Sequence, residues 1–132
     1  MSDPYTAIQV VMMPRDTNPH GTIFGGVILS YIDMAGAVAA RREIAQRGGG
    51  RDAKVVTVAV NRVEFKQPVL VGDVVRFETT VAKTGRTSIT MRVNVVSERA
   101  GELIHVTESE VVYVRVDDGR LPLPLFPAAL PA

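Results

Sequence analysis

Apolar and polar residues alternate along most of the second half of the chain. In residues 73–83, Val75, Phe77 and Val81 fall on one face and Glu78 falls on the other. A period of two residues is typical of a strand that buries one face. By the same reasoning, strands are predicted over residues 8–13, 55–65, 73–83, 87–95 and 102–116.

Between the first predicted strand and the others, the chain has a long run of apolar residues that predicts a helix. Residues 26–40 read GVILSYIDMAGAVAA, and Asp33 is the only charged residue among them. A helix that is apolar all round is normally buried on every side. This helix is expected to continue to about Arg47, where three consecutive glycines end it. Its length is then roughly 30 Å at the usual rise per residue.

The order of elements is one strand, one long helix and four strands. Short connections rich in glycine and proline join the later strands, so sequential neighbours are expected to pair as antiparallel hairpins. The simplest packing is an α+β fold, in which one curved antiparallel sheet wraps around a central helix. Because a single sheet covers only one side of that helix, a second copy of the chain is expected to cover the remainder.

Composition narrows the class of protein. The chain has 132 residues, with 15 Lys and Arg against 14 Asp and Glu, so its charge does not favour nucleic-acid binding. It has no cysteine, which excludes disulfides, thiolate metal sites and a cysteine nucleophile and is compatible with a cytoplasmic location. Residues 23–40 reach the lower length of a membrane span, but Asp33 at mid-run favours a buried helix instead.

Asp33 is the first candidate for chemistry, because a carboxylate inside an apolar helix is costly unless something pairs with it. The alternative is a structural aspartate that bonds only Ser30 or a nearby amide. Gly25 and Gly26 precede the helix, and their free N–H groups suit an oxyanion. Asp33 lies eight residues after Gly25, roughly 12 Å along the axis. That separation is too long for both to act on one carbonyl unless the chain folds back or a partner chain takes part. We therefore hypothesise that, in a two-fold dimer, the amides of one subunit and the acid of the other meet at one carbonyl.

Three segments resemble the hotdog-fold acyl-CoA thioesterases, in particular the cytosolic acyl-CoA hydrolase group. They are DTNPHGTIFGGVILSYIDMAGAVAA (16–40), VNRVEFKQPVLVGDVV (60–75) and KTGRTSITMRVNV (83–95). The resemblance covers nearly all of residues 5–118, which form the expected domain. The proline-rich tail, residues 119–132, falls outside it and is expected to lie extended, either docked or loose.

The resemblance implies a hotdog fold and hydrolysis of acyl-CoA without a cofactor or metal. The family's catalytic acid corresponds to Asp33, which acts as a general base or as a nucleophile, and its partner asparagine corresponds to Asn18. The amides that polarise the thioester carbonyl correspond to Gly25, with Gly26 beside it. The segment near the CoA moiety corresponds to Arg86, Thr87 and Ser88. The family forms hotdog dimers, often trimers of dimers, with Asp33 and Asn18 coming from opposite subunits.

Other functions fit the sequence less well. Asp16 and His20 resemble the acid–base pair of the hotdog enoyl-CoA hydratases, but their spacing is one residue short and Asp33 is left without a role. A non-catalytic acyl-CoA-binding module and a purely structural oligomer also remain as alternatives. His20 and His105 are far apart in sequence, so a metal site is not expected. A nucleic-acid or membrane partner is not expected either.

Overall fold

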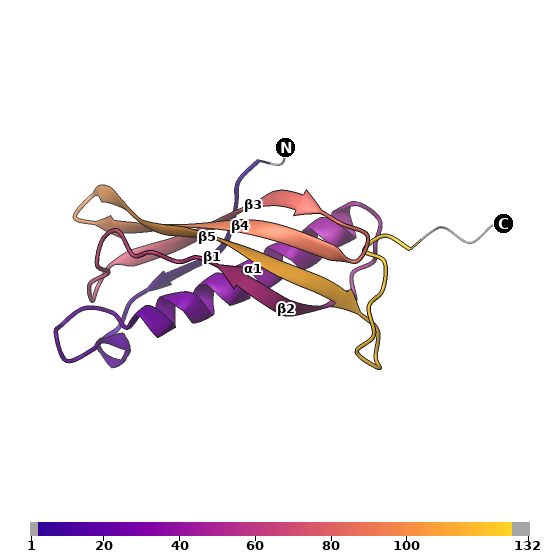
Figure 1. Ribbon diagram of the computed structural model, residues 1–132. Coiled ribbons are helices and arrows are strands. Elements are labelled where there is room, and N and C mark those ends of the chain that lie inside the picture. Colours follow the sequence, from indigo (N-terminus) through magenta and orange to yellow (C-terminus); the bar gives the residue numbers. More distant parts are fainter. Residues whose placement is uncertain (1–2, 128–132) are drawn as a thin grey trace.

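The computed structural model describes residues 3–127 as one helix packed against one sheet (Figure 1). The elements are β1 (Tyr5–Val11), the 3₁₀ helix η1 (Pro14–Asp16), α1 (Gly25–Gln46), β2 (Lys54–Asn61), β3 (Val74–Thr84), β4 (Ser88–Arg99) and β5 (Glu102–Val116). The predicted order of one strand, one helix and four strands is confirmed.

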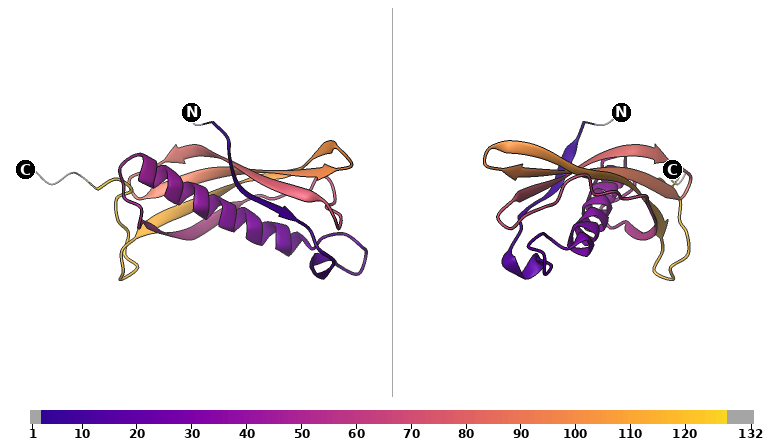
Figure 2. Two further views of the ribbon diagram at one scale, coloured as in Figure 1. Left: turned by 180° about the vertical axis from the view of Figure 1, so that it is seen from behind. Right: turned by 60° about the vertical axis from the view of Figure 1, so that its left-hand side comes forward.

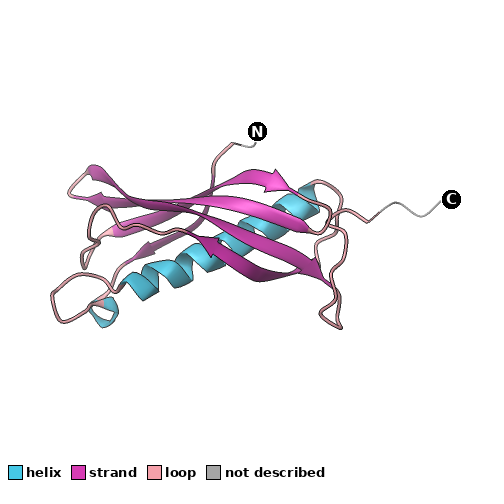
Figure 3. Cartoon of the chain, in the orientation of Figure 1, coloured by secondary structure: helices cyan, strands magenta, loops and turns pink. Residues whose placement is uncertain are grey.

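The five strands form a single antiparallel sheet in the order β1-β3-β4-β5-β2. The expected hairpins are confirmed for β3 with β4 and for β4 with β5. The expectation is wrong for β2 and β3, because β2 pairs with β5 at one edge of the sheet and β3 pairs with β1 at the other. The sheet curves along one side of α1 (Figures 2 and 3).

The core lies between α1 and the inner face of the sheet. Ile28, Ile32 and Ile44 of the helix are fully buried, as are Phe77 and Tyr113 of the sheet. The helical residues recur at spacings that keep them on one stripe of the helix, which explains why that stripe faces the strands. This packing fixes the position of every side chain on the sheet-facing side of α1.

The opposite side of the helix is not covered within one chain. Leu29, Met34 and Val38 are 39% to 47% exposed, so the expectation of burial on every side is wrong for the single chain. Apolar side chains are also exposed on β2. Val56 and Val60 are 42% and 43% exposed there.

The predicted strand boundaries differ from the observed ones at β1, β2 and β4, and β4 runs to Arg99 and not to residue 95. Strand β2 ends at Asn61 and not at residue 65, because Arg62 has a φ of 30°, which breaks the extended backbone. The first strand runs over Tyr5–Val11 and not over residues 8–13, since it extends to pair with Thr79 of β3. None of the helices described is both long and apolar enough to cross a membrane.

The first part of the proline-rich tail packs against the body of the molecule. Pro122 bridges to Val116 at the end of β5, and Leu125 is fully buried. The tail is therefore docked as far as Phe126, which packs against the core. Residues 128–132, to which the same expectation applied, lie outside the described part of the chain.

Candidate active site

The Asp33 carboxylate lies on α1 where the helix passes beside β2 and β5. Thr57 Oγ1 of β2 donates a hydrogen bond of 2.6 Å to Asp33 Oδ1. Tyr113 Oη of β5 donates to the main-chain oxygen of Asp33 at 2.6 Å and lies 3.3 Å from Oδ1. Oδ2 accepts no hydrogen bond from residues 3–127, so one carboxylate oxygen is held and the other is left for a ligand.

The purely local role for Asp33 does not fit this geometry. Ser30 Oγ donates to the carbonyl of Val27 at 3.3 Å and not to Asp33. The partners of the carboxylate come from two strands that follow the helix in the sequence. The structure thus joins the acid to the sheet rather than to its own helical turn.

Tyr113 reaches Asp33 because the helix is glycine at the crossing point. A Cβ on Gly36 would overlap the Tyr113 hydroxyl, so any larger residue would push the ring away. Burial, followed by the charge of Asp33, raises the pKa of Tyr113 well above its usual range. The phenol therefore stays protonated and acts as a donor.

The helix begins at Gly25, with Phe24 as its N-cap and no side chain capping it. The N–H groups of Gly25 and Gly26 form no hydrogen bond with any described residue. A pocket of about 300 Å³ opens beside Gly25. Its lining consists of Thr22, Ile23, Gly25, Ile28, Phe65, Lys66, Gln67, Pro68 and Val69. Unpaired amides at the mouth of a largely apolar pocket can hold a carbonyl oxygen.

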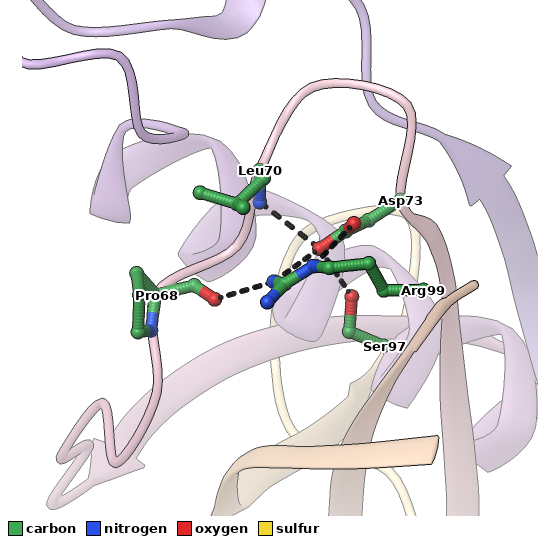
Figure 4. A network of polar contacts seen from close by, with 5 residues as sticks. All are labelled: Pro68, Leu70, Asp73, Ser97 and Arg99. Atoms are coloured by element: carbon green, nitrogen blue, oxygen red, sulfur yellow. Dashed lines mark hydrogen bonds and ion pairs between the residues drawn. The ribbon is translucent and has the colours of Figure 1, made fainter. Parts of the chain in front are cut away.

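One wall of this pocket is fixed by an ion pair between the buried Asp73 and the partly exposed Arg99 (Figure 4). Arg99 donates to both carboxylate oxygens of Asp73, at 2.9 Å and 2.7 Å, and also to the carbonyl of Pro68 at 3.1 Å. Asp73 also accepts from Ser97 Oγ at 2.7 Å and from the Leu70 N–H at 3.0 Å. The network ties the pocket-lining segment to the ends of β3 and β4.

The ionised form of Asp73 is the stable one in this network. Burial opposes its charge, but the hydrogen bonds from Arg99, from the Leu70 N–H and from Ser97 outweigh burial and lower its pKa. The carboxylate therefore holds its four donors in place at neutral pH.

Asn18 organises the loop before the helix. Its side chain donates to Thr22 Oγ1 at 2.7 Å, and its Oδ1 accepts from the main-chain N–H groups of His20 and Thr22. Within the described chain Asn18 makes no hydrogen bond to Asp33. A single chain therefore does not bring the two residues together.

Asp16 and His20, which resemble the acid–base pair of a hydratase, lie in the same loop. Asp16 Oδ2 accepts the Met13 N–H at 3.0 Å at the start of η1, and His20 is exposed. Asp16 thus has a local structural role, which makes the acid–base pair of a hydratase a poorer fit than Asp33.

Arg86, Thr87 and Ser88 lie in and just after the β3–β4 turn. The main-chain oxygens of Arg86 and Thr87 accept hydrogen bonds from Leu125 and Arg115, and the Arg86 side chain is exposed. In Figure 1 this turn lies near the end of α1, whereas Gly25 lies at its beginning. One chain therefore separates the candidate CoA-binding residues from the candidate carbonyl-binding amides.

Thr57 and Tyr113 were not identified from the sequence. Thr57 is the one polar residue in the run VVTVAV, and Gly36 is a glycine in the middle of the predicted helix. An isolated polar residue and a mid-helix glycine were the available signals, but pairing either with Asp33 requires the sheet order. Strand order follows from tertiary packing and not from local periodicity.

Comparisons with known proteins agree with this architecture. The model of the thioesterase superfamily matches residues 20–104. An "Uncharacterized acyl-CoA thioester hydrolase" of Buchnera aphidicola subsp. Baizongia pistaciae is 41% identical over 128 residues, which span 93% of this chain and 90% of the relative. Acyl-CoA thioester hydrolase YciA of Salmonella typhimurium is 40% identical, with 89% of this chain and 87% of the relative covered.

A solved structure gives the same result for the fold. Cj0915, described as a hexameric hotdog fold thioesterase of Campylobacter jejuni, superposes with a TM-score of 0.80 at 40% identity. The match covers 90% of this chain and 88% of that chain. The resemblance drawn from the sequence is thereby confirmed, and the chain belongs to the thioesterase superfamily and has the hotdog fold.

Proposed function

We propose that this protein hydrolyses acyl-CoA thioesters to a carboxylic acid and free CoA. The observation that carries the proposal is Asp33, the only charged residue of an apolar helical segment, held through one oxygen by Thr57 and open at the other. Relatives about 40% identical over most of both chains are acyl-CoA thioester hydrolases by name, which supports the same activity here.

In this proposal the Gly25 N–H binds the thioester oxygen and stabilises the charge that develops on it. Asp33 either removes a proton from water as the water attacks the carbonyl carbon, or attacks that carbon itself to form an anhydride that water then opens. In both routes the carbon–sulfur bond breaks, the CoA sulfur leaves as a thiolate and takes up a proton, and water supplies the new oxygen of the acid. Asn18 orients the water or the carboxylate.

The reaction requires two copies of the chain. Gly25 and Asp33 of one helix are separated by roughly 12 Å along the axis, too far to act on one carbonyl. The exposed apolar surface of α1 and the unpaired edge of β2 give a second copy an area to cover. A two-fold dimer through these elements lets the amide of one copy face the acid of the other.

We further propose that three such dimers associate, since the Campylobacter jejuni relative is described as hexameric. In the same assembly, Arg86 binds a phosphate of CoA through charge-assisted hydrogen bonds, and Thr87 and Ser88 lie beside it. Gly26 contributes a second amide near the carbonyl. A cytoplasmic location stays a prediction.

The test is an assay of thiol release with acyl-CoA substrates of different chain lengths, using the parent protein and Asp33→Asn. The parent should release CoA catalytically. The variant should keep the melting temperature but lose turnover by at least about a hundredfold, the scale of a lost general base. Asp52→Asn, at an exposed aspartate just before β2, is the matched control and should keep parent activity.

Three results would contradict the proposal. Turnover by Asp33→Asn within tenfold of the parent would remove Asp33 from the mechanism. Tight binding of acyl-CoA without any release of CoA would instead identify an acyl-CoA-binding module, and hydration of crotonyl-CoA without thiol release would identify a hydratase.

A further inference from the structure

A buried arginine lies at the opposite end of the molecule from the pocket. Arg115 near the end of β5 is only 8% exposed. No carboxylate among residues 3–127 forms an ion pair with it, and its Nε is buried without an acceptor. A buried guanidinium without an acidic partner is costly, so other hydrogen-bond acceptors must stabilise its charge.

These acceptors are two main-chain oxygens from separate parts of the chain. Arg115 Nη1 donates to the carbonyl of Gly49 at 2.7 Å and to the carbonyl of Leu125 at 2.8 Å. Gly49 lies three residues after Gln46, the last residue of α1, and Leu125 belongs to the C-terminal tail. The charge also lies close to the C-terminal end of a 22-residue helix, where the helix dipole favours a cation.

The tail segment held in this way contacts the β3–β4 turn. The Leu125 N–H donates to the carbonyl of Arg86 at 2.9 Å, and the Leu123 N–H donates to the carbonyl of Arg115 at 2.8 Å. The Arg115 N–H itself donates to the carbonyl of Thr87 at 2.9 Å. The fully buried Leu125 side chain anchors the segment in the core.

The contacts therefore form a continuous path. The Arg115 side chain fixes the carbonyl of Leu125, and the N–H of Leu125 fixes the main chain of Arg86. The Arg86 side chain, by contrast, is exposed and carries the charge that would meet a phosphate. Restricting the backbone of an exposed arginine reduces the entropy lost when its side chain binds a ligand.

We infer that Arg115 and the tail segment 121–126 position the Arg86 turn to bind the phosphate groups of CoA. Arg115 is a positioning residue, since it is buried and acts through Leu125 on Arg86. This inference rests on the proposed function for the identity of the ligand. It predicts that loosening the tail weakens recognition of the phosphate-bearing part of the substrate and leaves the chemistry at Asp33 intact.

The experiment compares Arg115→Gln with the parent on two substrates, an acyl-CoA and the corresponding acyl-pantetheine, which has the same thioester but no phosphate. We expect KM for acyl-CoA to rise about tenfold in the variant. We expect kcat for both substrates, and KM for acyl-pantetheine, to stay within twofold of the parent. A purely structural role would change both substrates alike.

Three further variants sharpen the test. Arg51→Gln removes an exposed arginine two residues after Gly49 and should leave every constant unchanged. Arg115→Lys keeps a cationic donor and should recover most of the lost affinity. The double variant Arg115→Gln with Arg86→Ala should have the same KM as Arg86→Ala alone, because Arg115 acts only through Arg86.

Calorimetric binding of free CoA and of pantetheine makes the result independent of turnover. If the parent hydrolyses no thioester but Arg115→Gln still weakens CoA binding about tenfold without affecting pantetheine, the proposed function fails and this inference stands. Equal loss on both ligands, additive effects in the double variant, or unchanged CoA binding would overturn the inference. If Arg115→Gln does not fold, Leu125→Ala, which loosens the same segment, decides between these outcomes.

Discussion

At the scale of single residues, the hydrogen bonds of Asp33 hold one carboxylate oxygen and leave the other for the proposed chemistry. Oδ1 is held at 2.6 Å by Thr57, with the Tyr113 hydroxyl at 3.3 Å. Both donors come from strands, so the carboxylate is oriented by the sheet while its charge stays available. Hydrogen bonds to a charged acceptor are the strongest of the ordinary ones, which makes Thr57 the main determinant of this orientation.

Replacing Thr57 with valine removes the donor and keeps the shape of the side chain. A hydrogen bond to a charged group is worth about 1.5 to 3 kcal/mol, so we expect kcat to fall roughly tenfold to a hundredfold. The melting temperature should change little, because Thr57 is exposed on an edge strand and valine is a good strand former. Steady-state hydrolysis of an acyl-CoA measures the effect.

Thr57→Ser is the matched control for this prediction, since it retains the hydroxyl and should keep activity near that of the parent. Parent-like kcat in Thr57→Val would mean that the carboxylate finds its working orientation without this bond.

At the scale of the elements, local pattern predicted much of the fold but little of its lateral order. The alternation in β3, β4 and β5 and the length of α1 are visible in the sequence because each depends on its own residues. The position of β2 beside β5 is not visible in the sequence, because tertiary packing decides which strands pair. The site divides in the same way. Asp33 is conspicuous as the one charge among residues 26–40, whereas Thr57 and Tyr113 join it only through the strand order.

The Asp73–Arg99 ion pair connects β3, β4 and the pocket wall, and its contribution to the stability of the fold depends on pH. The pKa of Asp73 is lower in the folded protein than in the unfolded chain, so the folded state binds fewer protons. Its contribution to stability is complete above the unfolded pKa of about 4 and is lost as the pH falls through the folded value. We expect the melting temperature of the parent to fall as the pH is lowered below about 4.

Asp73→Asn isolates the part of this dependence that belongs to Asp73. The variant cannot ionise at this position, so it should melt below the parent at pH 7, and the difference should shrink as the pH falls. Thermal melts of both proteins between about pH 3 and pH 7 measure it. A difference that stays constant across this range would show that the charge of Asp73 does not carry the effect. Glu98→Gln, at an exposed carboxyl on the same hairpin, is the control.

At the scale of the whole molecule, the sheet covers only one side of the helix. Leu29, Met34 and Val38 leave an apolar surface on α1, and β2 presents an unpaired edge next to it. Exposed apolar area continuous with an open strand edge is typical of an interface between copies. It adjoins Asp33, so in the proposed dimer the same surface also completes the site.

Val60→Lys tests whether assembly and activity depend on this surface. Val60 pairs with the buried Val111 in the register of β2 and β5, so its side chain lies on the helix-facing side of the sheet, yet it is 43% exposed. A lysine there places a charge in the proposed interface, and a charge buried without a partner is costly. We expect sedimentation to show dissociation to monomers at concentrations where the parent is assembled, and hydrolysis to fall at least about tenfold.

The control is Leu103→Lys, at a leucine that is 62% exposed at the start of β5, beside the β4–β5 turn and away from β2. It should keep at least the dimer and its activity. The two measurements on Val60→Lys must change together, because one chain holds Gly25 and Asp33 too far apart to act on the same carbonyl. A monomeric Val60→Lys that retains full activity would show that a single chain completes the site, and the two-chain mechanism would then be wrong.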